Sequence, residues 1–351
     1  MAAMIVSAII IVGYTAAGGF LAASTTDFIQ SIIMTFAILF VLGFSTISAG
    51  GIDAVMDNVR NLPGYLSMTA TYSASTGSAS PYGALTIVST LAWGLGYFGM
   101  PHILLRFMAI EDENKLKLSR RVGSVWVVIA MAVAVMIGIV GRTLSANGTL
   151  SGADSETIIV RIADFLSGYG PIPALIAGLI LAGILASTMS TADSQLLAAS
   201  SSVSQNLLLE TLHLKVSEKA SMLFARLTVI VIAVLGVIIA RDPNSSIFGI
   251  VSFAWAGFGA SFGPVVICSL FWKRTTLPGA IAGMVVGGVS VFAWKYLLKP
   301  MGGVFGIYEL LPAFVAGIVT IFVVSLLTKA PEQSILDEFE QARAHGALEN
   351  E

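Results

Sequence analysis

Long runs of apolar residues limit most strictly what this chain can fold into. Nine runs reach the roughly 17–25 residues that a helix needs to cross the hydrocarbon of a bilayer. They lie at residues 3–23, 28–48, 84–108, 123–145, 173–207, 221–241, 246–271, 278–298 and 310–328. The chain is 56% apolar and 11% charged, whereas a soluble domain carries roughly 25% charged residues. We therefore predict an all-α polytopic membrane protein with its transmembrane domain at residues 1–329.

The charge and the reactive side chains exclude several classes of function. A net charge of −2 argues against a nucleic-acid partner and leaves the lipid bilayer as the expected environment. The single cysteine, Cys268, excludes an intrachain disulfide framework. With three histidines and one cysteine, the nucleophile–base or metal cluster that an enzyme needs does not assemble. We expect no enzyme activity and no catalytic residue.

Basic residues predict the orientation, because cytoplasmic connections are enriched in lysine and arginine. Every second connection is positive. The basic residues there are Lys115, Lys117, Arg120, Arg121, Lys215, Lys219, Lys273, Arg274 and Lys329. We expect a cytoplasmic carboxyl terminus, in the cell membrane, and an external amino terminus. An apolar segment that starts at residue 3 from outside predicts a chain that lacks upstream spans.

Two longer connections and a tail lie outside the apolar runs. Residues 49–83 and 146–172 are rich in Gly, Ser, Thr and Pro. We expect one short surface helix in each, at Ile52–Leu62 and Ser155–Ser167. Residues 330–351 form an acidic, water-soluble tail that should be cytoplasmic and partly helical.

The third run contains a motif with two interpretations. Gly94, Gly96 and Gly99 have the GxGxxG spacing of a dinucleotide-binding loop, which requires a preceding strand and an acid about 20 residues later. Apolar runs flank these glycines instead, which disfavours a nucleotide site. Three glycines and Pro101 inside a span predict a discontinuous helix, because free backbone at membrane depth must face protein or a cavity. A helix kinked for close packing is the alternative.

Aromatic residues around the predicted break indicate a ligand. Trp93 and Tyr97 beside free backbone carbonyls suit a small solute with one apolar and one charged part. His102 fits either packing or solute contact. The glycine-broken stretch 253–264, with Trp255, fits either a flexible gate or close helix packing.

The fifth run carries a stripe of hydroxyl groups. Ser187, Ser190, Thr191 and Ser194 share one helix face by their i, i+3, i+4, i+7 spacing, and Asp193 lies among them. Hydroxyl oxygens, and a carbonyl left free where the helix bends, suit a small hard cation. In the alternative, the hydroxyls bond to carbonyls one turn earlier and only pack helices. An acid within a span is a functional candidate, although Asp193 also fits a structural acid near the interface.

Asp27 lies at the start of the second run, beside Thr25 and Thr26. It suits a cation passing to the cytoplasm, and equally a helix N-cap, where Asp, Ser and Thr are favoured. Arg226, at the edge of a span, is expected to anchor its helix rather than to act on a ligand.

Five stretches of the sequence resemble the sodium/solute symporter family. They are GGFLAASTTDFIQ, AWGLGYFGMPHILLRFMA, ILASTMSTADSQLLAASSSVSQNL, AWAGFGASFGPVVICSLFWKR and GAIAGMVVGG. They follow the family's order over nearly the whole chain. The resemblance implies a leucine-transporter-like inverted-repeat fold, in which this chain matches core helices four to twelve and lacks the first helices.

The resemblance also implies sodium-coupled symport of a small solute, with proline expected and sodium as the co-transported ion, by alternating access. Trp93, Tyr97 and Pro101 match residues of the family's solute pocket, Ser190 and Thr191 match hydroxyl ligands of sodium, and Asp27 matches an acid that handles sodium. The whole candidate solute set is Trp93, Gly94, Gly96, Tyr97, Met100 and Pro101. The candidate sodium set is Asp27, Ser187, through its carbonyl, Ser190, Thr191, Asp193 and Ser194.

The chain departs from the family pattern at Met100, where the family has Gln, so the pocket region loses an amide. Core helix one, which would supply further sodium ligands and one pocket wall, is missing. Two other interpretations stay open. One is a sodium symporter for another small solute, such as another amino acid or pantothenate. The other is a truncated fragment that does not transport.

Overall fold

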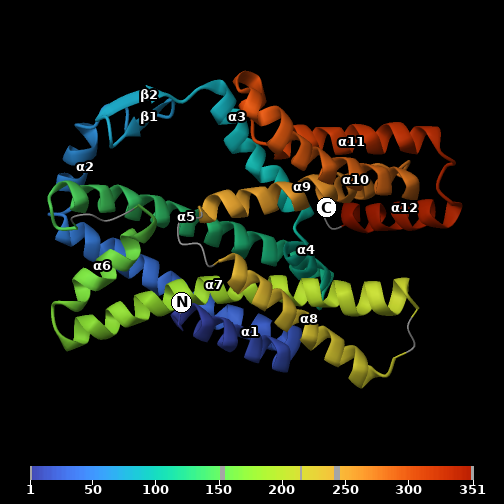
Figure 1. Ribbon diagram of the computed structural model, residues 1–351, viewed down its shortest axis with the longest axis horizontal. Coiled ribbons are helices and arrows are strands. Elements are labelled where there is room, and N and C mark those ends of the chain that lie inside the picture. The colour runs from blue at the N-terminus through green and yellow to red at the C-terminus, as the bar shows by residue number, and fades with distance from the viewer. Residues whose placement is uncertain (1, 151–154, 214–215, 241–245, 349–351) are drawn as a thin grey trace. The chain divides into compact units, whose positions relative to one another are not determined.

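A computed structural model describes residues 2–150, 155–213, 216–240 and 246–348 (Figure 1). Helices dominate the described chain, which divides into two compact units. Unit 1 comprises Met1–Pro81 and Lys117–Asp242, and unit 2 comprises Tyr82–Leu116 and Pro243–Glu351.

Unit 1 is built on two long helices that pack along each other, α1 and α7. Its helices are α1 (Ala2–Ser48), α2 (Ile52–Arg60), α5 (Leu116–Ala146), α6 (Ile158–Ser167), α7 (Pro171–Ser201) and α8 (Glu218–Ile239). The core is aliphatic, with Val41 of α1, Ile137 of α5, Ile162 of α6 and Ile180 of α7 all at most 1% exposed. Beyond Ser201, α7 continues as a π-helix, Ser202–Thr211.

Unit 2 places three apolar helices side by side. Its helices are α3 (Ala84–Ala92), α4 (Pro101–Met108), α9 (Ile247–Phe271), α10 (Leu277–Ala293), α11 (Leu310–Leu327) and α12 (Gln333–Leu348). The helices α9, α10 and α11 contact one another (Figure 1). Small side chains at their contacts, including Ala256, Ala260 and Ala313, are completely buried and let the backbones approach closely.

Seven helices in the described residues are long and apolar enough to cross a membrane, where the sequence predicted nine spans. The first two predicted spans join into α1, and the third is divided into pieces shorter than a span. Large apolar side chains cover the outer faces of these helices; Leu21 is 79% and Leu327 82% exposed. Such faces suit lipid rather than water. The expected all-α, multi-pass membrane fold is therefore confirmed.

Helix α1 has one break, at Gly19, where φ is 60° and ψ is −150°. Only glycine adopts such a conformation without strain. The sequence predicted two separate spans here, 3–23 and 28–48, with Asp27 at the start of the second, where it fitted an N-cap. The N-cap interpretation is wrong, because Asp27 lies inside α1 beyond the break, and the Thr25 and Thr26 hydroxyls donate to carbonyls within the same helix. A glycine marks the break, and the polar residues do not.

The connections agree with the sequence in their helices and add one strand pair. Helices α2 and α6 confirm both surface helices, and α12 confirms a helical tail. The hairpin of β1 (Ala70–Ser73) and β2 (Ser78–Pro81) was not expected. Its strands pair antiparallel, with Ala70 opposite Pro81, around a turn at Gly77, whose φ is 64°. These strands are short and rich in serine, so they lack the alternation of apolar and polar residues that predicts a strand.

Candidate functional site

The third apolar run forms the predicted discontinuous helix. Helix α3 ends at Ala92, a tighter 3-10 helix covers Trp93–Gly99, and Met100 is extended before α4 begins at Pro101. Proline has no N–H to continue a helical ladder and favours an extended residue before it. Because a helix rather than a strand precedes the glycines, the dinucleotide-loop interpretation is excluded.

Two glycines of the break are also contact surfaces for α9. A Cβ on Gly99 would lie 2.5 Å from the Phe258 carbonyl oxygen and 2.8 Å from the Gly263 nitrogen. A Cβ on Gly96 would overlap the Trp255 indole, whereas one on Gly94 would meet nothing within 4 Å. The break and the close packing, posed as alternatives from the sequence, are therefore both present.

Five rings gather around the break, and we call them the aromatic cluster: Trp93, Tyr97, Phe248, Trp255 and Tyr308. Trp93 stacks at 15–16° on the rings of Phe248, Trp255 and Tyr308, with centroid distances of 5.3, 5.6 and 5.8 Å. Tyr97 meets Trp255 edge-on at 4.8 Å and is 52% exposed. The cluster therefore joins an exposed Tyr97 and a half-buried Trp93 through their shared neighbour Trp255.

Some backbone carbonyls at the break already accept hydrogen bonds from the protein. The Trp255 Nε1–H donates to the Trp93 carbonyl at 2.9 Å, so this carbonyl is not free for a ligand. The Met100 carbonyl accepts from the N–H groups of Ile103 and Leu104, and the Met100 side chain is only 3% exposed. A role for Met100, Gly94, Gly96 or Pro101 in solute binding stays a prediction.

Sequence reasoning missed Tyr308 and its neighbour Glu309. Glu309 forms an ion pair with Lys299, with 2.7 Å between Oε2 and Nζ. Burial, and then the Glu309 carboxylate, raise the pKa of Tyr308, so its phenol stays a hydrogen-bond donor at neutral pH. The sequence feature that pointed to them is an acid next to a tyrosine, directly before the last apolar run.

The hydroxyl stripe on α7 shows the back-bonded arrangement. Ser190 and Thr191 donate to the Ser187 carbonyl at 3.1 and 3.3 Å, and Ser194 donates to the Ser190 carbonyl at 2.9 Å. The Ser187 carbonyl is therefore not freed by a bend, because α7 runs unbroken through this stretch. Each hydroxyl uses its one proton in this way and keeps oxygen lone pairs, so the back-bonding leaves cation binding open.

Asp193 is completely buried and has a partner from another helix. The Tyr14 hydroxyl of α1 donates to Asp193 Oδ2 at 2.8 Å, and Ser194 Oγ lies 3.3 Å from Oδ1. Unit 1 thus places a buried acid on α7, within the hydroxyl stripe and in contact with α1. Tyr14, a polar residue within the first apolar run, was missed because nothing local shows which helix it faces.

Arg226 of α8 holds α1 beside its break. Its Nε–H donates to the Ala16 carbonyl at 3.1 Å. A helix interrupted at Gly19 leaves carbonyls of the preceding turn without their usual partner. The arginine supplies a donor at this point, in agreement with the anchoring role that we expected.

The geometry defines a class first: a multi-pass helical membrane protein with a broken, ring-lined helix in unit 2 and, in unit 1, a buried acid, Asp193, on a helix that carries a stripe of hydroxyls. The profile of the Sodium:solute symporter family matches residues 1–287, and the chain belongs to that family. The family consists of secondary transporters rather than enzymes.

Proline transporters are among the curated proteins that the chain is similar to. The chain is 39% identical over 330 residues to the high-affinity proline transporter of Bacillus subtilis (strain 168), covering 94% of this chain and 66% of the relative. It is 40% identical over 338 residues to the sodium/proline symporter of Haemophilus influenzae, covering 94% and 64%. The chain therefore spans about two thirds of the length of these relatives.

A solved structure shares the fold. It is a sodium-coupled sialic acid symporter in a substrate-bound, outward-open state, with a TM-score of 0.69 and 18% sequence identity. The alignment covers 94% of this chain and 67% of that one. This likeness confirms the leucine-transporter-like fold class.

Proposed function

We propose that the chain acts in the sodium-coupled uptake of a small solute, with proline as the first candidate. The observation that carries the proposal is the break between α3 and α4, where the exposed Tyr97 ring and the Trp93 ring both pack against Trp255. Discontinuous helices bind substrates in transporters because the ends of half-helices carry partial charge. The names of the relatives, which include sodium and proline, support the same ion and solute.

The solute site would use the two half-helix ends and the aromatic cluster. The amino-terminal end of α4 favours an anionic group, and the carboxyl-terminal end of α3 favours a cationic one. Trp93 and Tyr97 would contact the apolar part of the solute, with Gly94, Gly96, Met100 and Pro101 shaping the break. A compact zwitterion with an apolar ring, such as proline, fits these three chemistries.

The sodium site would use the acids and hydroxyls of unit 1. A fully buried carboxylate, that of Asp193, favours a cation in its neighbourhood. Oxygen ligands suit a small hard ion. The proposed ligands are Asp27, Ser187 through its carbonyl, Ser190, Thr191, Asp193 and Ser194.

Ion and solute would each stabilise the same occluded state, so that each strengthens the binding of the other. Such coupling is typically worth about 1–3 kcal/mol and is reciprocal. Alternating access then converts a sodium gradient into solute uptake. With the basic connections inside, the carboxyl-terminal helix α12 would be cytoplasmic and the α10–α11 connection external.

Replacing Ser190 and Thr191 together with alanine should raise the sodium concentration for half-maximal proline uptake by about fivefold or more, since two oxygen ligands are lost. Maximal uptake at saturating sodium should fall less. The measurement is the initial uptake rate against sodium concentration in proteoliposomes.

Thr188→Ala is the matched control, because Thr188 is on the same helix and donates to the Ile184 carbonyl in the same manner, but lies off the stripe. It should leave the sodium response unchanged. An unchanged response in the double variant would refute the ion site. If other amino acids or pantothenate compete with labelled proline and proline itself does not, the solute is another one.

A further inference from the structure

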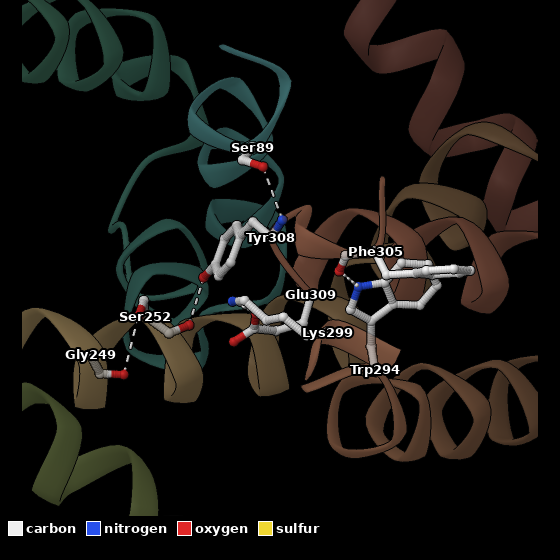
Figure 2. A network of polar contacts seen from close by, with 8 residues as sticks. All are labelled: Ser89, Gly249, Ser252, Trp294, Lys299, Phe305, Tyr308 and Glu309. Atoms are coloured by element: carbon white, nitrogen blue, oxygen red, sulfur yellow. Dashed lines mark hydrogen bonds and ion pairs between the residues drawn. The ribbon is translucent and has the colours of Figure 1, made fainter. Parts of the chain in front are cut away.

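We propose that Tyr308, held in place by the Lys299–Glu309 ion pair, is a positioning residue that fixes the Trp93 ring for the solute. The inference rests on the proposed function of the break. The residues lie in or beside the α10–α11 connection, between Trp294 and Leu310 (Figure 2).

The ion pair joins the two ends of the α10–α11 connection, Lys299 and Glu309. The Glu309 side chain is 3% exposed, and its Oε2 lies 2.7 Å from Lys299 Nζ. A carboxylate buried to this extent destabilises a fold strongly if its partner is removed. The glycines at 302 and 303 both have positive φ, so this segment needs side-chain contacts to hold one conformation. The Trp294 Nε1–H donates to the Phe305 carbonyl at 3.1 Å and gives a second closure.

Tyr308 joins the α10–α11 connection to two helices, α3 and α9. Its backbone N–H donates to Ser89 Oγ of α3 at 3.0 Å, and its hydroxyl donates to the Ser252 carbonyl of α9 at 2.6 Å (Figure 2). Its ring lies at 16° to the Trp93 ring. Because Glu309 is the next residue, the ion pair fixes the backbone from which Tyr308 projects.

The role of this arrangement is to set the orientation of one ring. Trp93 has three near-parallel neighbours, and Tyr308 is the one supplied by the α10–α11 connection. Offset ring pairs contribute about 0.5–1.5 kcal/mol each beyond their buried area, so removing one loosens Trp93 without unfolding the cluster. Solute affinity should suffer, whereas the sodium ligands of unit 1 are untouched.

Two variants test the positioning role by transport. Tyr308→Leu should raise the solute half-saturation constant about tenfold, while the maximal rate and the sodium half-saturation at saturating solute stay within about twofold. Lys299→Glu and Glu309→Lys should each act in the same way, and the double charge swap should restore affinity. Tyr296→Leu is the control, because Tyr296 is 60% exposed and lies in the same region. Equal losses of rate and of both affinities would overturn the inference.

A second measurement does not depend on transport. Near-ultraviolet circular dichroism reports the fixed orientation of stacked rings, and Glu309→Gln leaves every ring in the chain. Its aromatic signal should fall toward that of Tyr308→Leu; an unchanged spectrum would overturn the inference. A wild-type chain with no sodium-stimulated uptake would instead refute the proposed function, and the spectra would still decide whether the ion pair positions Tyr308.

Discussion

Gly99→Ala should abolish most solute uptake, while Gly138→Ala, in the apolar helix α5, should leave it intact. The new Cβ at Gly99 would lie 2.5 Å from the Phe258 carbonyl oxygen and 2.9 Å from Gly259 Cα, and backbone atoms of α9 cannot rotate away. Overpacking of this kind typically costs about 1–3 kcal/mol and shifts the backbone. At Gly138 the Cβ would meet nothing within 4 Å, so the pair separates close packing from the general effect of losing a glycine in an apolar helix.

The effect is measured as the solute half-saturation constant together with the thermal stability of the purified chain. We expect Gly99→Ala to raise the first by more than about tenfold and to lower the second, since the break and α9 must separate. Similar behaviour of the two alanine variants would show that α9 does not position the break.

Asp193→Ala should remove most of the sodium stimulation of uptake. The carboxylate is completely buried and accepts a hydrogen bond from the Tyr14 hydroxyl. Its loss removes a negative charge from the proposed ion site and leaves the Tyr14 hydroxyl without its acceptor, which costs about 1–3 kcal/mol in a buried place. Sodium titrations of uptake should show at least about a tenfold weaker response.

Two companion variants locate the origin of this loss. Tyr14→Phe keeps the ring and the Asp193 charge, so it should weaken the sodium response less than Asp193→Ala does. Asp164→Ala removes an exposed acid of α6 in the same unit and should have no effect. A normal sodium response in Asp193→Ala would assign Asp193 a purely structural role.

Features that depend on local pattern were predictable from the sequence. The length of the apolar runs predicted the membrane class, because a helix of that length crosses the hydrocarbon. Three glycines with Pro101 predicted the broken helix, because backbone groups that leave the helical hydrogen-bond pattern at membrane depth must face protein or a cavity. The short helices predicted at Ile52–Leu62 and Ser155–Ser167 are present, as Ile52–Arg60 and Ile158–Ser167. The two spans predicted at residues 3–23 and 28–48 form one helix, α1. Its break lies at Gly19 and not at the polar residues around Asp27.

Features that depend on a distant partner were not predictable. The sequence showed that the residues from Ser187 to Ser194 share a helix face. It did not show that Asp193 accepts a hydrogen bond from Tyr14 of another helix. Tyr308 and Trp255 belong to the aromatic cluster through contacts with Trp93 from more than 150 residues away, which no local spacing encodes. A single sequence shows the chemistry of each segment and leaves open which segments meet.

Sodium-driven accumulation of proline is tested most directly in proteoliposomes that hold the 351-residue chain. Labelled proline is supplied outside under an inward sodium gradient, or under an equal potassium gradient. We predict accumulation above the external concentration with sodium only, which disappears when an ionophore dissipates the gradient. Equal uptake with both ions, or no uptake with either, would contradict sodium-coupled proline transport by this chain.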